Sequence, residues 1–485
     1  MGLLNAGLLS LAALPLVKSE TVLGVYIFSR HGDRTPKALA PTNLTSLGAE
    51  QVFASGDYYR NRYVAADASS PVLGLSRNTA ALTQLTVTAP IDNVLQSSAQ
   101  AFLQGLYPPA GDFSTQDLRN KSLVTAPLGG YQYIPINTVD TTFSGKQPED
   151  NPWLQGGSGC DNAVVSSNNY LSSSEYLATS RQSEAFYQGL LPVIGSTFDA
   201  DEATFKNAYA IFDYVNVATI HNQSIPSSDL LTPDTLRELK LLANEHEWGL
   251  AYNGSEEIRA IAGATLAGQI VEALNGTIAG RSKLPVHIQF GAYAIFSSFF
   301  GLAKLPAVSD DFTGVVDYAA SMAFELVTNA TVGGPGKSYP GPDDISVRFL
   351  FSNGSAAQLA PRAYPLFGQG ETLLPWTRFL SEMNKFAVSD TADWCRVCGV
   401  TTGACASKSS GSGSGSDGNG ATPAPKSSPL SVPVAGVVGA LVTLAVVLGV
   451  EALIYVLSGM TLIRKSTLAA QAGAGAADAA QMTKV

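Results

Sequence analysis

Residues 30–36 read Arg-His-Gly-Asp-Arg-Thr-Pro, and residues 22–28 before them read Val-Leu-Gly-Val-Tyr-Ile-Phe. A short, continuous apolar run of this kind predicts a strand buried on both faces, as in a parallel sheet. Ligands of open α/β sheets bind beyond the carboxyl ends of the strands. The sequence therefore places residues 30–36 where a ligand site is expected.

His31 stands between two arginines, Arg30 and Arg34, and this combination suits a phosphate ligand. Guanidinium groups bind phosphate oxygens bidentately, and a neutral imidazole nitrogen can attack phosphorus to give a covalent intermediate. The alternative is a surface-exposed basic turn without chemistry.

Strands and long helices alternate along the rest of the chain, which indicates an α/β sheet. Further buried strands are predicted at residues 284–290 and 347–351. Helices are predicted after the motif, where Val52, Tyr59 and Tyr63 share one face, and at residues 234–248 and 256–274. Residues 114–172 predict an irregular insertion and residues 173–250 a helical cap. We therefore expect a mixed or parallel sheet flanked by helices, with a cap subdomain at roughly 114–250.

The composition sets limits on size and partners. The chain has 485 residues, 45% of them hydrophobic, which is enough for one large domain or two ordinary ones. Its formal net charge of −10 argues against nucleic acid or an anionic membrane surface as a partner. An anionic substrate must then be attracted by local cations.

Both ends of the chain carry targeting signals. Residues 1–19 predict a secretory signal peptide. Residues 432–457 are almost wholly apolar and long enough for a transmembrane helix, and the Arg464-Lys465 pair places the tail at 458–485 in the cytoplasm. A glycolipid anchor is the weaker alternative, because residues follow the apolar stretch. Glu451 marks the inner boundary of the span or faces a partner helix.

Between these signals we expect an ectodomain at 20–405, extracellular or lumenal, joined by a Ser/Gly/Pro-rich linker at 406–431. This topology is that of a single-pass type I membrane protein. In such a compartment cysteines pair, and sequons are glycosylated. The disulfide candidates are Cys160, Cys395, Cys398 and Cys405, with three connectivities open; zinc or redox chemistry at Cys395-x-x-Cys398 is the alternative. The glycosylation candidates are Asn43, Asn120, Asn222, Asn253, Asn275, Asn329 and Asn353.

Several stretches, in order along the predicted ectodomain, resemble the histidine acid phosphatases, the branch of the histidine phosphatase superfamily that includes secreted acid phosphatases and phytases. Residues 30–36 are close to that family's Arg-His-Gly-x-Arg-x-Pro. The further matching stretches are Leu44–Gly48, Ser98–Gln100, Gly105–Pro109, Ile258–Gly263 and Trp394–Gly399.

The resemblance implies a phosphoglycerate-mutase-like fold and a phosphomonoester or other phosphorylated ligand. It implies that His31 is phosphorylated as the nucleophile, and that Arg30 and Arg34 hold the phosphoryl oxygens. It implies no organic cofactor and no metal.

The chain departs from the family pattern at two places. A third arginine is expected about ten residues before Ser98-Ala99, where Thr88 stands. A His-Asp pair is expected after a buried strand, where Gly291-Ala292 stands. We treat Thr88, Gly291 and Ala292 as degenerate positions. Loss of the general acid usually costs about 10²–10⁴-fold in rate.

None of the other three histidines restores the pair in the sequence. His246-Glu247 is interpreted as a solvated or interdomain pair, with a relocated acid as the alternative. His287 is interpreted as a core histidine, and His221 as a surface residue. Asp33 and Asp92 are the other carboxylates considered as a replacement acid.

These observations support an acid phosphatase-like protein of the cell surface or secretory pathway. It would hydrolyse phosphomonoesters through a phosphohistidine, with impaired activity. The alternative is a non-catalytic relative that binds a phosphorylated ligand or a protein. A third hypothesis is a structural or adhesion protein on an enzyme scaffold.

Overall fold

The computed structural model describes residues 20–138, 159–221, 224–333 and 338–406. The predicted signal peptide, the transmembrane segment at 432–457, the tail and all but the first residue of the linker lie outside these ranges. Within them, no helix combines the length and apolar character that crossing a bilayer requires.

A seven-stranded mixed sheet forms the centre of the fold, with the order β2-β5-β1-β6-β7-β8 and with β9 paired to β7. β1 runs parallel to β5 and antiparallel to β6. The strands of this sheet are β1 (Thr21–Arg30), β2 (Leu85–Thr88), β5 (Val286–Gly291), β6 (Ser321–Thr328), β7 (Ile345–Ser352), β8 (Arg362–Ala363) and β9 (Leu373–Pro375). A separate hairpin consists of β3 (Thr115–Asp117) and β4 (Leu123–Thr125).

β1 is buried on both faces because its side chains alternate between two hydrophobic cores. Tyr26 and Phe28 pack with the apolar side chains of the helices on one face. Val25 and Ile27 pack with those on the other face. This arrangement explains the unbroken apolar run in the sequence and carries the motif to the carboxyl edge of the sheet.

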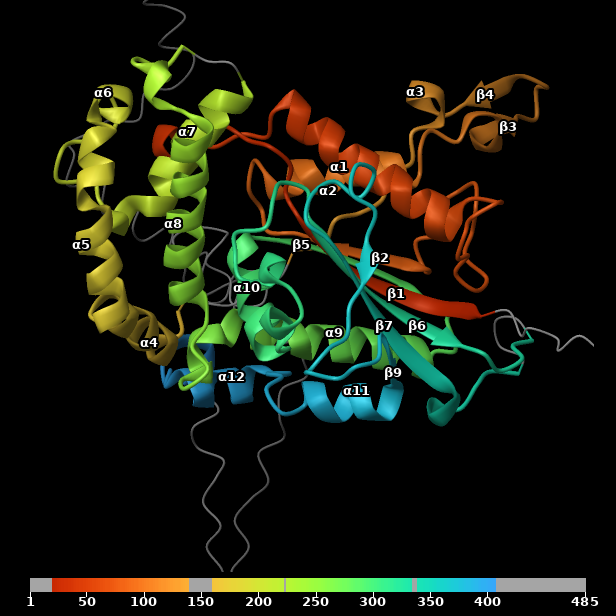
Figure 1. Cartoon of the computed structure of the whole chain (residues 1–485). Coiled ribbons are helices and arrows are strands. Elements are labelled where there is room, and N and C mark those ends of the chain that lie inside the picture. The colour runs from red at the N-terminus through yellow and green to blue at the C-terminus, as the bar shows by residue number, and fades with distance from the viewer. Residues whose placement is uncertain (1–19, 139–158, 222–223, 334–337, 407–485) are drawn as a thin grey trace, which may run out of the picture. The chain divides into compact units, whose positions relative to one another are not determined.

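Helices cover both faces of the sheet (Figure 1). α1 and α2 pack on the face of Val25, and α9, α10 and α11 on the face of Tyr26; α4 to α8 form a helical lobe at one side of the sheet. The helices are α1 (Ser46–Tyr59), α2 (Leu95–Leu106), α3 (Pro127–Gly130), α4 (Asp161–Leu171), α5 (Ser174–Gly189), α6 (Leu191–Ile194), α7 (Ala208–Ile220), α8 (Pro233–Ala251), α9 (Ile261–Ala279), α10 (Tyr293–Leu302), α11 (Trp376–Met383) and α12 (Thr391–Cys398).

The predicted strands at 22–28, 284–290 and 347–351 are confirmed as β1, β5 and β7, and the predicted helices as α1, α8 and α9. β6 was not predicted, although all eight of its residues are buried. The irregular insertion expected at 114–172 is wrong at its end, since residues 161–171 form α4. The cap expected at roughly 114–250 is narrower in the structure. The β3–β4 hairpin lies away from the lobe of α4 to α8 (Figure 1).

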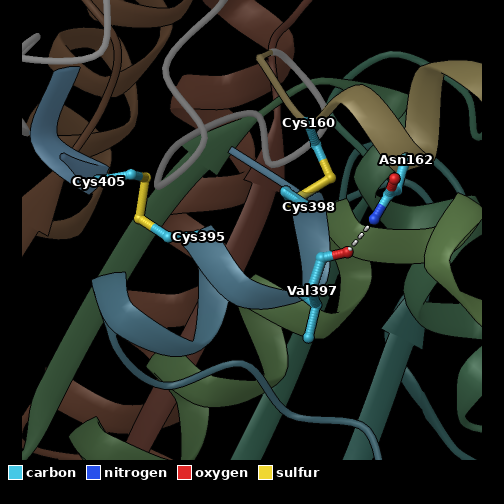
Figure 2. Close-up of a disulfide and its surroundings, with 6 residues drawn as sticks. All are labelled: Cys160, Asn162, Cys395, Val397, Cys398 and Cys405. Carbon is cyan, nitrogen blue, oxygen red and sulfur yellow. Dashed lines mark hydrogen bonds between the residues drawn. A yellow bond between two sulfur atoms is a disulfide. The ribbon is translucent and has the colours of Figure 1, made fainter. Parts of the chain in front are cut away.

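All four cysteines are paired, which selects one of the three open connectivities. Cys160 bonds to Cys398 and Cys395 bonds to Cys405. Figure 2 shows the first bond joining α4 to α12, beside a hydrogen bond of 2.8 Å from Asn162 Nδ2 to the Val397 carbonyl. With every thiol in a disulfide, the zinc alternative at Cys395-x-x-Cys398 lacks thiolate ligands.

Two glycines let the motif loop pack directly on the start of α1. A Cβ on Gly32 would lie 2.1 Å from the Gly48 carbonyl oxygen, and a Cβ on Gly48 would lie 2.0 Å from the Asp33 carbonyl oxygen. Backbone atoms cannot give way as a flexible side chain does. The close approach therefore requires glycine at both positions.

We predict that Gly48→Ala lowers the free energy of unfolding by about 1–3 kcal/mol or more, because the new methyl group overpacks this contact. Chemical denaturation measures the change. Gly276→Ala is the matched control: it lies in α9 with no neighbouring atom within 4 Å of the added Cβ. Removing a helical glycine there raises stability by roughly 0.5–1 kcal/mol. Equal effects of the two substitutions would contradict the packing argument.

Candidate active site

Hydrogen bonds from both flanking helices hold the motif loop in place. The Gly32 amide donates to Ser98 Oγ of α2 at 3.3 Å, and the Asp33 amide donates to Gln51 Oε1 of α1 at 2.9 Å. The Thr45 amide donates to the Asp33 carbonyl at 3.1 Å. The loop is thus a rigid part of the core, which rules out the surface-exposed basic turn considered from sequence.

His31 is 7% exposed, and its hydrogen bond assigns the tautomer. Nδ1 lies 2.7 Å from the Gly32 carbonyl oxygen, which can only accept, so Nδ1 carries the proton. Burial, together with the charges of Arg30 and Arg34, holds the pKa of His31 well below its usual value. The ring is therefore neutral, and the lone pair on Nε2 is the nucleophilic one.

Arg30 lies among tyrosine rings. Its Cζ atom is 4.7 Å from the Tyr318 ring centroid and 5.3 Å from that of Tyr293. One terminal nitrogen donates to the Val316 carbonyl and the other lies 3.5 Å from the Tyr209 hydroxyl. Among the described residues, no partner for its buried Nε is present. Arg30 is therefore fixed but keeps unused hydrogen-bonding capacity.

Arg34 is held by a carboxylate from the helical lobe. Its terminal nitrogens bind Asp213 of α7 bidentately, at 2.8 and 3.0 Å, and both side chains are 2% exposed. Asp213 also accepts from the Lys37 amide at 2.8 Å. Much of the Arg34 charge is thereby balanced inside the protein, an arrangement that the sequence did not predict.

Lys37 supplies a third cation that sequence reasoning missed. Its Nζ lies 5.7 Å from the Tyr209 ring centroid and 5.8 Å from that of Tyr293. Its charge also contributes to the lowered pKa of His31. Lys37 directly follows the motif, three residues after Arg34, so the sequence alone could have indicated it as a further cation near the site.

His221, the residue that follows α7, makes a third contact with the motif loop. Its Nε2 donates to the Asp33 carboxylate at 2.6 Å, and Thr45 Oγ1 donates to the same carboxylate at 2.9 Å. The His221 side chain is 27% exposed, so its interpretation as a surface residue holds only in part: the contact with buried Asp33 was not predicted. Tyr209 and Asp213 are spaced i and i+4 on one side of α7, and His221 directly follows the last residue of that helix. The Asp33 carboxylate is therefore occupied by hydrogen bonds from His221 and Thr45, which argues against its use as a replacement acid.

The degenerate position Thr88 lies at the end of β2, where it lines a cavity with His287 and Gln289. Thr88 itself is not the residue that contacts the motif loop. That contact is made by Ser98, near the start of α2. Just before α2, Asp92 Oδ1 accepts from the amide of Val94 at 2.8 Å and from that of Leu95, the first residue of the helix. Residues 92–95 contain no cation.

Gly291 pairs in register with Arg30, at the edge where the family's histidine is expected. A Cβ on Gly291 would lie 2.5 Å from the Phe28 ring. The core has therefore closed over this position, and a histidine there would have to displace Phe28.

Tyr293, the residue after Gly291-Ala292, makes a hydrogen bond to the carboxylate of Glu247. Tyr293 Oη donates to Glu247 Oε2 of α8 at 2.6 Å, and His246 Nδ1 lies 2.9 Å from Glu247 Oε1. The His246-Glu247 pair thus reaches the residue that follows Gly291-Ala292. The pair is not solvated, and its contact from α8 of the helical lobe to α10 fits the interdomain half of the interpretation.

His287 matches its interpretation as a core histidine. It is 8% exposed, its Nε2 lies 3.1 Å from Thr277 Oγ1, and burial lowers its pKa to about 4. It lines the cavity of about 540 Å³ that also contains Thr88, on the α9 face of the sheet. Across the described part of the chain, no three His, Cys, Asp or Glu side chains are arranged to hold a metal ion.

Comparisons with known proteins give a consistent result. A model of the histidine phosphatase superfamily (branch 2) matches residues 39–352. A lysosomal acid phosphatase of Xenopus laevis is 25% identical over 331 residues, which cover 65% of this chain and 68% of that protein.

Solved structures show the same fold. The phytase of Citrobacter braakii has a TM-score of 0.52 at 15% identity, covering 78% of this chain and 99% of that one. A Hafnia alvei phytase in complex with tartrate has a TM-score of 0.50 at 13% identity, covering 78% and 98%. With its mixed sheet, its helical lobe and a match over residues 39–352, the chain belongs to branch 2 of the histidine phosphatase superfamily.

Proposed function

We propose that this protein hydrolyses phosphomonoesters through a phosphohistidine on His31. The observation that carries the proposal is the neutral, buried His31 ring, fixed by the Gly32 carbonyl with Nε2 unprotonated. A bond forms between Nε2 and phosphorus while the bond from phosphorus to the ester oxygen breaks. Water then attacks phosphorus and releases inorganic phosphate. Arg30, Arg34 and Lys37 supply positive charge to the transferring phosphoryl group.

The proposed activity is impaired for a reason of charge. Asp213 already occupies the guanidinium of Arg34 bidentately, so a phosphate must compete with an internal carboxylate. The histidine expected before the general acid is also missing at Gly291. Both features lower transition-state stabilisation relative to a pocket with free cations.

The Arg34–Asp213 pair also favours a second candidate, a non-catalytic protein that binds a phosphorylated ligand. Because Asp213 balances its charge, Arg34 is buried and paired in the absence of any ligand. This candidate predicts phosphate binding without turnover.

We further propose that the described residues form the ectodomain of a single-pass type I membrane protein, anchored through residues 432–457. The two disulfides fit an oxidising extracellular or lumenal compartment. Four predicted glycosylation sites, Asn43, Asn120, Asn275 and Asn329, are exposed, and Asn253 and Asn353 are half-buried.

We predict that the full-length chain hydrolyses an aryl phosphate at acid pH and that His31→Ala abolishes this turnover, because no other nucleophile replaces Nε2. Base-quenched labelling with a ³²P aryl phosphate detects the acid-labile phosphohistidine. His287→Asn is the control, since that ring lies in a separate cavity. Equal turnover by the wild type and His31→Ala would reject the catalytic proposal and leave the binding candidate.

We predict that Asp213→Asn tightens binding of inorganic phosphate by at least about tenfold, because it removes a competing negative charge near Arg34. The same substitution lowers the free energy of unfolding by about 3–5 kcal/mol, since Arg34 stays buried without a counter-charge. Titration calorimetry and chemical denaturation measure the two effects. Asp234→Asn is the control, a surface carboxylate whose side chain is 81% exposed. Weaker phosphate binding by Asp213→Asn would show that Asp213 does not compete with the ligand.

We predict that the protein purified from a eukaryotic secretory host carries N-linked glycans. Digestion with an N-glycosidase should lower its mass by several glycan units, whereas Asn120→Gln should remove one unit. An unchanged mass would contradict the proposed location of the ectodomain.

A further inference from the structure

We propose that Glu247 and Tyr293 supply the proton that the ester leaving group requires, with His246 as the positioning residue. The inference rests on the proposed function, since it concerns the phosphoryl transfer to His31. It assigns a role to two side chains that stand outside the family's expected His-Asp position.

The first support is the place of Tyr293 in the fold. Tyr293 begins α10, immediately after β5 and the degenerate Gly291-Ala292. Since Gly291 lies in register with Arg30, the strand delivers Tyr293 to the same edge as the motif loop. Its ring lies 5.3 Å from Arg30 Cζ and 4.7 Å from the Tyr209 ring centroid.

The second support is the hydrogen-bonded chain behind Tyr293. Its hydroxyl is 2.6 Å from Glu247 Oε2, and Glu247 Oε1 is 2.9 Å from His246 Nδ1. His246 is buried between the rings of Tyr176 and Phe205, with centroid distances of 6.2 and 5.3 Å. The imidazole therefore fixes the carboxyl group in one orientation, as a structurally supported acid requires.

The third support is the way these groups divide between core and solvent. Tyr293 is 7% exposed, whereas the Glu247 side chain is 15% exposed and so can exchange protons with water. Burial, together with the nearby Glu247, raises the pKa of Tyr293 well above its usual value, so its hydroxyl stays protonated. Lys37 is exposed, and its Nζ lies 5.8 Å from the Tyr293 ring centroid.

The proton balance follows from this geometry. As the bond from phosphorus to the ester oxygen breaks, that oxygen keeps the electron pair and takes the hydroxyl proton of Tyr293. The phenolate is reprotonated from water through the Glu247 carboxylate, whose side chain is 15% exposed, so no phenolate accumulates. When water attacks the phosphohistidine, the proton that it loses returns to solvent along the same path.

The test exploits the leaving group, because an aryloxide departs without a proton whereas an alkoxide does not. The full-length wild type, Tyr293→Phe and Glu247→Gln are assayed at acid pH with 4-nitrophenyl phosphate and with glycerol 2-phosphate. We expect both variants to lose about 10²–10³-fold in kcat/KM on the alkyl ester and less than about tenfold on the aryl ester. Tyr293→Phe retains the ring and its packing, so it carries the test if Glu247→Gln fails to fold.

The control is Tyr187→Phe, which removes another buried tyrosine hydroxyl, one without a hydrogen-bond partner among the described residues. It should change neither rate. Equal losses on both esters would indicate a role in binding or structure and overturn the inference. So would a wild type that cleaves only the aryl ester, or an unchanged alkyl rate in both variants. A wild type that cleaves neither ester instead defeats the proposed function itself.

Discussion

The buried ion pair between Arg34 and Asp213 is the interaction on which the site depends. Both side chains are 2% exposed, so neither charge can be satisfied by water if the pair breaks. Separating such a pair costs about 3–5 kcal/mol. α7 is therefore bound to the motif loop, and two further contacts join them: Tyr209 of α7 with Arg34, and His221, the residue after α7, with Asp33. The helical lobe and the nucleophile loop form one rigid unit.

This rigidity limits the chemistry. A phosphoryl group needs cations that are not already neutralised, and here the second motif arginine has an internal partner. Arg30, whose buried Nε has no partner among the described residues, keeps a donor with which to meet a ligand. The lowered pKa of His31 has the same electrostatic origin, because its charged form is disfavoured by burial and by the surrounding cations. The positive charges that would bind an anion therefore also keep the His31 nucleophile neutral.

Apolar packing occupies the position where the family pattern expects a His-Asp pair. Phe28 fills the space beside Gly291, so a histidine cannot be restored there without rebuilding the core. Polar side chains are present next to this position instead. Tyr293, the residue after Ala292, contacts Glu247 of α8, and Glu247 contacts His246. A carboxyl group and an imidazole are again present at this edge of the sheet, supplied by a different segment of the chain.

The sequence by itself determined β1, β5 and β7, the position of the motif at a strand end, and the absence of arginine and His-Asp where the family pattern expects them. These features rest on local patterns: apolar runs, helical periodicity and contiguous motifs. Tertiary structure alone decided the disulfide pairing and the contacts of Asp213, His221 and Glu247. Those partners lie more than 170 residues from the motif, and the face of a helix that meets a distant loop depends on packing rather than on the neighbouring sequence. For the same reason the contact of half-exposed His221 with Asp33 was not predicted, since a polar loop in the sequence does not indicate a buried carboxylate in another element.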